Sequence, residues 1–163
     1  MHPQRNRPEG LESAAPTVLA VGEGERFPIG PPDADSWVDV KASSEATAGT
    51  FYFSEVQVAP GIPGPPPHVH QQTHDMFFVL SGRLGVRLDD EERVVDRGAF
   101  VCVPPGVVHT YFNADAAPVR FLHFQTPGGW EGHLREIQAV SASGKFTEEQ
   151  HLKILARYDF QPV

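Results

Sequence analysis

The stretch that decides the fold is Pro67-His68-Val69-His70-Gln71-Gln72-Thr73-His74-Asp75-Met76-Phe77-Phe78-Val79, and His109 follows it in Pro104-Pro105-Gly106-Val107-Val108-His109. His68 and His70 are two residues apart, and residues i and i+2 of a β-strand point to the same face. Two imidazoles on one face, with a third on a neighbouring strand and a carboxylate nearby, suit a transition metal. The pattern therefore predicts a metal site built on β-strands.

The residues around these histidines form two regularly spaced motifs. The first is His68-x-His70, four residues, Asp75, six residues and Gly82. The second is Gly98, five residues, Pro104-x-Gly106, two residues, His109, three residues and Asn113. We expect Gly82, Gly98 and Gly106 to occupy turns with unusual backbone angles, and Asn113 to hold the turn that follows it.

Together the two motifs resemble the signatures of the cupin superfamily, in the right order and with the short gap between Gly82 and Gly98 found in microbial single-domain cupins. The stretch from about 38 to 137 and the tail at 147–158 resemble bacterial monocupins described as quercetin-dioxygenase-like. The resemblance implies an all-β fold, the cupin double-stranded β-helix or jelly-roll barrel, with a short C-terminal helical segment. One anchor departs from the family, because Asp75 stands where glutamate is usual.

A length of 163 residues predicts one domain. We expect residues 1–16 to be a flexible arm, because they hold Pro, Arg, Glu and Ser and little that can be buried. Residues 17–163 then form a single cupin domain, with the metal-binding barrel at about 38–126 and the helical segment at about 130–160.

The net charge of −8 and the lack of a Lys/Arg cluster argue against nucleic acid or an anionic membrane as partner. No apolar run approaches the roughly 18–20 residues of a membrane span, and no apolar core follows the N-terminal arginines as in a secretory signal. By default these features predict a cytoplasmic protein. The single cysteine, Cys102, excludes an internal disulfide and is most simply a small buried residue.

The rest of the chain predicts many short strands. Residues 17–21 are a possible first strand, residues 22–35 are loop-like, and residues 37–41 alternate as a half-buried strand should. Further strands are expected at 50–59, 75–80, 83–88, 93–95, 99–103, 109–113 and 119–125, with an acidic turn at 89–92. Strands at this spacing, separated by turn signals, indicate a barrel or jelly roll.

In the C-terminal part of the chain, the spacing of apolar residues changes from strand-like to helical. Residues 130–140 have partly helical spacing, and a second helix is predicted to begin at Thr147, which has Gln150 three residues on, as in a capping box. Trp130, Glu131 and Arg135 either form a lid over the barrel mouth or pack this helical segment on the outside. His2, His133 and His151 have no visible partner, so we expect them to be solvated.

We expect His68, His70, Asp75 and His109 to bind one divalent transition metal, which could be Fe, Mn, Ni, Co, Cu or Zn. His74 is the alternative to Asp75, because some cupins use a fourth histidine. Adjacent strand residues face opposite sides, so the two are not expected to face the metal together. Asp75 shares its parity with Phe77 and Val79, which favours Asp75 as the inward residue.

An apolar substrate pocket is a further hypothesis, although ordinary barrel core is the simpler interpretation of most of its residues taken singly. Tyr111 shares strand parity with His109, and His123 lies between aromatic residues, either as a pocket residue or as a core histidine. The candidate pocket residues are Phe51, Phe53, Phe77, Val79, Tyr111 and His123.

Three functions remain open. The first is a metal-dependent, quercetinase-like dioxygenase that acts with O2 on a small phenolic or enolisable molecule. In such enzymes the motif glutamate takes a proton from the substrate hydroxyl, which implies Asp75 as the catalytic residue here. The second is a cyclase or isomerase that uses the metal as a Lewis acid, and the third is a cupin that binds a metal or small ligand without turnover. The resemblance also implies a homodimer, with the N-terminal strand and apolar residues of the outer sheet as candidate contacts.

Overall fold

The computed structural model describes residues 16–31, 33–144 and 146–163. The arm predicted at 1–16 therefore lies outside the described residues except for Pro16, and so does His2. In this part of the chain no helix is both long enough and apolar enough to cross a membrane.

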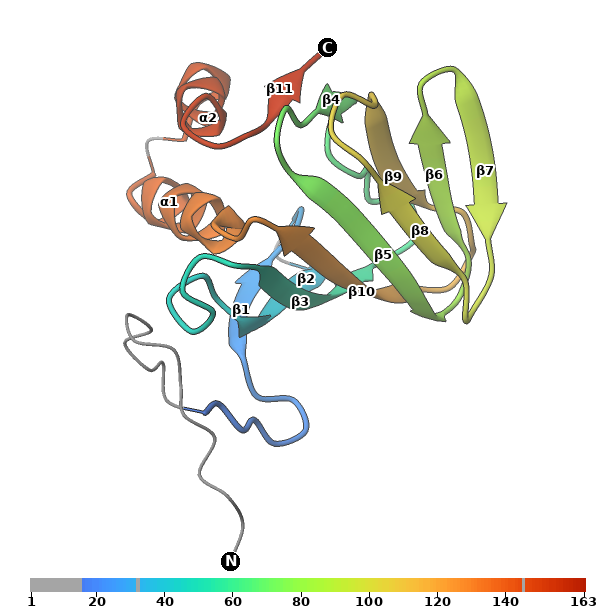
Figure 1. Cartoon of the computed structure of the whole chain (residues 1–163), viewed down its shortest axis with the longest axis horizontal. Coiled ribbons are helices and arrows are strands. Elements are labelled where there is room, and N and C mark those ends of the chain that lie inside the picture. The colour runs from blue at the N-terminus through green and yellow to red at the C-terminus, as the bar shows by residue number, and fades with distance from the viewer. Residues whose placement is uncertain (1–15, 32, 145) are drawn as a thin grey trace, which may run out of the picture.

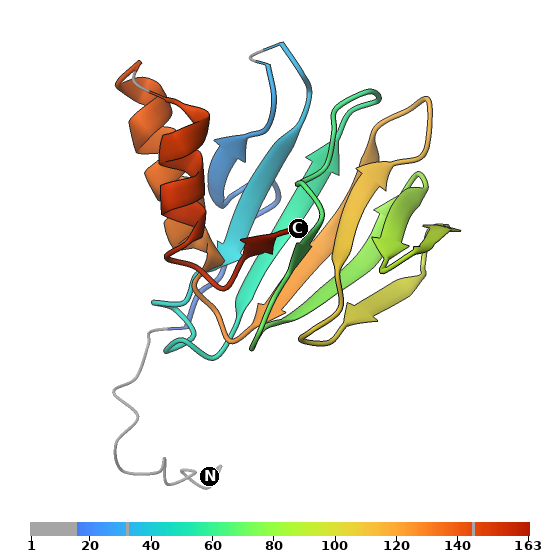
Figure 2. The same ribbon diagram turned by 90° about the horizontal axis from the view of Figure 1, so that it is seen from above.

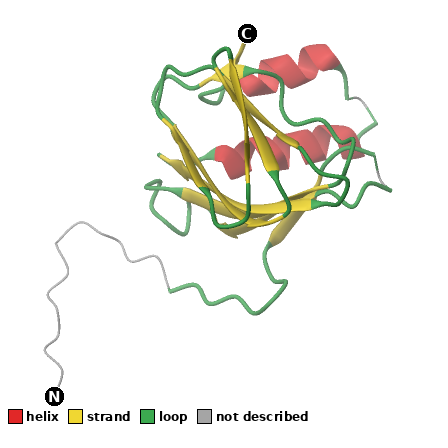
Figure 3. Ribbon diagram, turned by 90° about the vertical axis from the view of Figure 1, so that its right-hand side faces the viewer, coloured by secondary structure: helices red, strands yellow, loops and turns green. Residues whose placement is uncertain are grey.

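The strands form two antiparallel sheets, and both helices lie on one side of them (Figures 1 and 3). The six-stranded sheet has the order β1 (Glu25–Pro28), β2 (Trp37–Ala42), β3 (Tyr52–Val58), β10 (Val119–Thr126), β5 (His74–Ser81) and β8 (Phe100–Val103). The five-stranded sheet has the order β11 (Gln161–Pro162), β4 (His68–Val69), β9 (His109–Asn113), β6 (Leu84–Leu88) and β7 (Glu91–Val95). Two facing sheets with short connections agree with the predicted jelly roll.

The helices lie in the C-terminal part of the chain, as the change from strand-like to helical spacing of apolar residues predicts. They are α1 (Trp130–Ala142) and α2 (Glu148–Leu155). Figure 2 shows them next to β1 and β2, with the chain returning through β11 towards the sheets. Thr147 and Gln150 form the predicted capping box at the start of α2.

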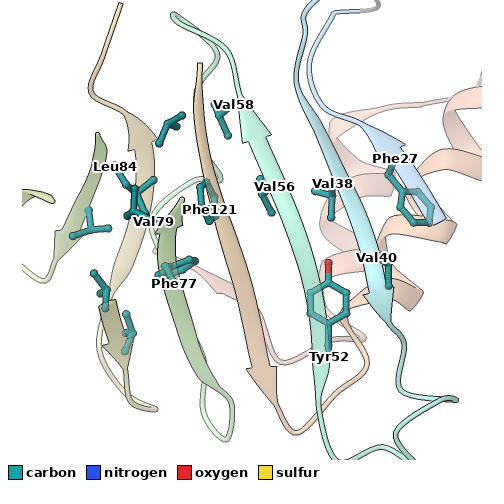
Figure 4. Close-up of a cluster of buried hydrophobic side chains, with 14 residues drawn as sticks. Phe27, Val38, Val40, Tyr52, Val56, Val58, Phe77, Val79, Leu84 and Phe121 are labelled. Atoms are coloured by element: carbon teal, nitrogen blue, oxygen red, sulfur yellow. The ribbon is translucent and has the colours of Figure 1, made fainter. Parts of the chain in front are cut away.

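The core lies between the sheets and is made by alternating strand residues. In β3 every second side chain, from Tyr52 to Val58, is buried, as a sheet with one face on the core requires. Figure 4 shows such side chains projecting from successive strands into one cluster, with Val56 of β3 beside Phe121 of β10. Phe77 and Val79 of β5 belong to this core.

The motif residues shape the turns as expected. Gly82, Gly98 and Gly106 have φ values of 74°, 87° and 88°, in the left-handed region that glycine adopts at least cost. Asn113 donates hydrogen bonds to the carbonyls of Val58 and Ala117, both at 2.9 Å. It therefore ties the end of β9 to β3 and to the following turn.

Two expectations about strands at the N-terminal end are wrong. Residues 17–21 form no strand with any described segment, and Val18 and Val21 are almost fully exposed. The first strand is instead β1, inside the segment expected to be a loop, where Glu25 pairs with Val40 and Phe27 with Val38. A short edge strand of this kind depends on its partner, because its own residues show little periodicity.

Three smaller expectations are also corrected. The turn expected at 89–92 ends early, because β7 begins at Glu91 and pairs with β6. Cys102 is exposed, because Val101 and Val103 on either side of it point into the core. His133 is only 7% exposed, since α1 turns this residue towards the body of the protein. His151 is half-buried.

Candidate metal centre

Four polar side chains meet between the two sheets. His68 on β4 pairs in register with His109 on β9, and His70 follows directly after β4. Asp75 enters from β5 of the other sheet. The exposed fractions of these four residues are only 2–3%, so residues from both sheets build a site that is closed to bulk solvent.

The three histidines are oriented by backbone carbonyls. The Nδ1 atom of His68 lies 2.9 Å from the Pro66 carbonyl, and that of His109 lies 3.0 Å from the Val107 carbonyl. The Nδ1 atom of His70 contacts the carbonyl of Asp159. A carbonyl can only accept, so each Nδ1 carries the hydrogen and each Nε2 keeps its lone pair for a metal.

One donor atom from each of the four side chains can be chosen so that all lie within 4.8 Å of one another. The Nε2 atom of His70 is buried and has no hydrogen-bond partner among the described residues. A buried nitrogen without a partner is costly unless a ligand satisfies it. Three neutral imidazoles and one carboxylate form a donor set that divalent transition metals accept, so these residues fit a metal ion.

Asp75 is surrounded by histidines. Its Oδ1 lies 2.5 Å from Nε2 of His123, and its Oδ2 lies 3.2 Å from Nε2 of His109 and 3.7 Å from that of His70. Burial acts to raise the pKa of Asp75, but the contacts with His123, His109 and His70 outweigh it and hold this pKa well below its usual range. The carboxylate is therefore ionised and directed into the cluster.

The pKa values of His68 and His70 shift in opposite directions. Burial, and then the neighbouring His109, lowers the pKa of His68 to about 3. Burial also acts to lower the pKa of His70, but Asp75 and the Asp159 carbonyl outweigh it and raise this pKa. His68 is therefore neutral, and the His70–Asp75 pair attracts a positive charge, either a proton or a metal cation.

His74 lies on the other side of β5. It is exposed, while Asp75 beside it is buried, as the alternation of strand side chains requires. The structure thus brings Asp75 together with the three histidines and leaves His74 outside the cluster.

The candidate pocket residues divide into two groups. Tyr111 and His123 line a cavity of about 40 Å³ beside the cluster, and Phe77 stacks on His123 with ring centroids 5.2 Å apart. Val79 is a core residue.

Phe51 and Phe53 do not line this cavity. Both rings pack on Phe124, whose side chain points to the opposite face of β10 from the buried His123. Their aromatic character alone could not tell the two faces of the sheet apart.

Two residues near the C-terminus also belong to the site, although no motif in the sequence indicates them. Asp159 provides the carbonyl that orients His70, and Phe160 stacks on His68 with centroids 3.9 Å apart and an angle of 13° between the rings. Pairing of β11 with β4 brings this segment to the cluster. Only the likeness of the tail to quercetin-dioxygenase-like cupins could have drawn attention to it.

The three residues considered as a lid have different positions. Trp130 lines the cavity beside the cluster. Glu131 is buried and accepts a hydrogen bond from the Ser44 backbone N–H at 2.8 Å. Arg135 forms ion pairs with Glu25 and Glu45 on the surface. Of these three residues, Trp130 alone is next to the candidate metal centre.

Comparison with known proteins agrees with this geometry. Residues 54–124 match the family model described as Cupin domain. The chain is 35% identical over 98 residues to the quercetin 2,3-dioxygenase of Bacillus subtilis, an overlap that covers 59% of this chain and 27% of that protein. The chain thus spans about a quarter of the length of this curated relative.

Solved structures share the fold at low sequence identity. KdgF from Halomonas sp. has a TM-score of 0.61 and 16% identity, covering 72% of this chain and 99% of that one. The polyketide cyclase RemF from Streptomyces resistomycificus has a TM-score of 0.57 and 22% identity, covering 69% and 80%. A sugar phosphate isomerase from Silicibacter pomeroyi has a TM-score of 0.56 and 22% identity, covering 68% and 75%. At these identities the likeness establishes the fold alone.

Proposed function

We propose that this protein, whose residues 54–124 match the family model described as Cupin domain, is a metal-dependent dioxygenase acting on a small phenolic or enolisable molecule. The observation that carries the proposal is the buried set of His68, His70, Asp75 and His109 next to a cavity. The partial similarity to a quercetin 2,3-dioxygenase supports the choice of reaction.

The residues of the site would have different roles in the reaction. His68, His70 and His109 would hold the metal through Nε2, because their Nδ1 atoms are engaged by carbonyls. A bound redox metal would supply activation of O2 and of the substrate oxygen. Asp75 would complete the ligand set and accept the proton of the substrate hydroxyl, the role of the motif glutamate in quercetin-dioxygenase-like cupins. His123 would hold the other oxygen of Asp75.

The first test is the metal content of the purified protein, measured by mass spectrometry. We expect about one redox metal per chain, which His109→Ala removes and His74→Ala retains, because His74 is exposed on the outer side of β5. Oxygen uptake with a panel of flavonols and simple phenols would follow, with the same two variants. Full metal occupancy without uptake on any member of the panel would contradict the dioxygenase.

A second candidate is a cyclase or isomerase that uses the metal as a Lewis acid. The same four donors suit zinc, and polyketide cyclase and sugar phosphate isomerase structures share the fold. Stoichiometric zinc, with substrate conversion that continues without O2, would favour this reaction over the dioxygenase.

The third candidate is a metal- or ligand-binding protein without turnover. Asp75 keeps this reading open, because it is one methylene shorter than the usual glutamate and His123 holds one of its oxygens. A tightly bound small molecule recovered unchanged after incubation with the metal-loaded protein would favour it.

We also propose that the protein is a homodimer. Phe78 and Phe100 pair in register on β5 and β8, and their side chains are 40% and 62% exposed. In the described residues β8 is the last strand of its sheet, and an edge strand with an exposed aromatic residue is suited to pairing with a second copy.

A further inference from the structure

A second, larger cavity adjoins the metal centre. It has a volume of about 340 Å³ and lies among α1, α2, β1, β2 and the proline-rich segment at 60–67. It shares four lining residues with the small cavity beside the metal ligands: Pro65, Tyr111, Trp130 and Phe160. Its volume is at the lower end of the range for pockets that hold small organic molecules.

The lining of this cavity is mostly apolar, and its polar side chains are those of Tyr111, His133 and His151. Among the described residues that form it there is no Asp, Glu, Lys or Arg. Leu134, Ile137 and Leu155 contribute from the two helices, and Val38 and Val58 from the sheet. A charged group placed here would lose its hydration without gaining an opposite charge, so the cavity favours an uncharged ligand.

His133 is the unusual member of the lining. It is only 7% exposed, and neither ring nitrogen has a hydrogen-bond partner within the described part of the chain. Burial, and then the nearby His151, lowers the pKa of His133 to about 4. Near neutral pH the ring is therefore uncharged and offers one donor and one acceptor. Leaving both unpaired is unfavourable unless a bound molecule engages them.

A series of stacked rings connects His133 to the metal ligands. His133 stacks on Trp130 with centroids 4.1 Å apart, and Trp130 stacks on Phe160 at 5.5 Å. Phe160 in turn stacks on His68 at 3.9 Å. Because the rings cover one another's faces, they form a continuous aromatic boundary from the second cavity to the candidate metal centre. Ring edges of such a boundary pack favourably against the face of an aromatic ligand.

We propose that this cavity binds an uncharged aromatic molecule and that His133 recognises a hydroxyl or carbonyl group on it. His133 is then a specificity-determining residue that lies outside the metal cluster. Only the identification of this molecule as the substrate, with its reacting end towards the metal, rests on the proposed function. The binding itself does not depend on turnover.

The test is equilibrium dialysis of the full-length protein with three probes: 2-naphthol, naphthalene and 2-naphthoate. We expect 2-naphthol to bind roughly three- to tenfold more tightly than naphthalene, because it can pair with His133. We expect 2-naphthoate to bind at least about tenfold more weakly than 2-naphthol, because the cavity offers no cation. Equal affinities for the three probes, or tightest binding of 2-naphthoate, would overturn the proposal.

Two variants and a control locate the binding. His133→Phe keeps an aromatic ring to stack on Trp130 but removes both nitrogens, so the preference for 2-naphthol over naphthalene should disappear. Ile137→Trp should fill the cavity and weaken both probes at least about tenfold. His74→Phe, the same exchange at an exposed position, should change neither the preference for 2-naphthol nor the affinity for either probe. A preference that survives His133→Phe, or binding that Ile137→Trp leaves unchanged, would place the ligand elsewhere.

Failure of this inference and failure of the proposed function can be told apart. Metal content and oxygen uptake test the metal centre, and dialysis with naphthalene-type probes tests the cavity. Normal probe selectivity without oxygen uptake would leave the cavity assignment standing and reject the dioxygenase. Oxygen uptake without probe selectivity would support the dioxygenase and reject the cavity assignment.

Discussion

Asp159 shows how much a single residue can contribute to this site. Its carboxylate accepts hydrogen bonds from the backbone N–H groups of Gln71, Gln72 and Thr73, at 2.7, 2.8 and 2.8 Å. The Thr73 hydroxyl adds a fourth at 2.8 Å, and the Asp159 carbonyl orients His70. Asp159 therefore holds the turn at residues 71–73 that connects β4 to β5.

We predict that Asp159→Ala lowers metal affinity by roughly 10- to 100-fold, the usual cost of losing a residue that supports a metal ligand. Loss of the backbone contacts should also lower the free energy of unfolding by about 2–3 kcal/mol. Metal titration and urea denaturation measure the two effects. Asp115→Ala, at a half-buried carboxylate that pairs with Arg83, is the control and should leave metal affinity unchanged. Unaltered metal binding in Asp159→Ala would show that the candidate ligands do not depend on the contacts of this carboxylate with residues 71–73.

Gly64 occupies the tightest position in the proline-rich segment. A Cβ atom at this residue would lie 1.7 Å from the carbonyl oxygen of Tyr111, so β9 could not keep its place next to the segment. We predict that Gly64→Ala destabilises the protein by roughly 3 kcal/mol or more, as overpacking against backbone does. Chemical denaturation measures this loss.

Gly98→Ala is the matched comparison for this prediction. Gly98 has φ +87° and nothing within 4 Å of the added Cβ, so its cost should be the left-handed backbone alone, about 1–2 kcal/mol. Equal losses in the two variants would mean that the contact between Gly64 and β9 relaxes easily.

At the scale of elements, α2 is a short helix whose start is well defined. The Thr147 side chain accepts from the Gln150 N–H at 3.2 Å, and the Gln150 side chain accepts from the Thr147 N–H at 3.2 Å. Helix α2 buries Ile154 and Leu155, and the chain after it leads to Asp159 and the candidate metal centre. Its capping therefore bears on the site as well as on the helix.

We predict that Thr147→Ala lowers the free energy of unfolding by about 1 kcal/mol, because it removes the N-cap oxygen. Lys153→Ala should stay within about 0.5 kcal/mol, because the Lys153–Glu149 pair lies on the surface. Urea denaturation of both variants tests the difference. A loss from Lys153→Ala as large as that from Thr147→Ala would contradict the importance of the cap.

At the scale of the whole molecule, the outer face of β5 and β8 is the surface proposed to join two copies. We predict that Phe100→Glu converts a dimer to a monomer, because it places a charge on the apolar pair with Phe78. Val94→Glu is the control, since Val94 is 49% exposed but lies on β7 of the other sheet. Multi-angle light scattering gives the mass of each variant. A wild-type monomer, or a dimer that survives Phe100→Glu, would reject this interface.

Much of this structure follows from local patterns in the sequence. Strand alternation separates the buried Asp75 from the exposed His74, because neighbouring residues of a strand must face opposite sides. The same rule places Tyr111 on the side of His109, next to the candidate metal ligands. The glycine turns and the cap at Thr147 also follow, because their conformations depend only on a few adjacent residues.

Other features arise only when distant segments meet. The sequence by itself determined the jelly roll and the four candidate ligands, since their spacing and parity are properties of single strands. Tertiary structure alone decided that β1 pairs with β2, that Phe51 and Phe53 pack against Phe124 on the outer face of the sheet, and that Asp159 and Phe160 return to the candidate metal centre. Tertiary structure also decided that His133 is buried beside a cavity. The physical reason is that the burial of a side chain, and its contacts with distant segments, depend on how sheets and helices pack together. The periodicity of residues within one segment does not determine that packing.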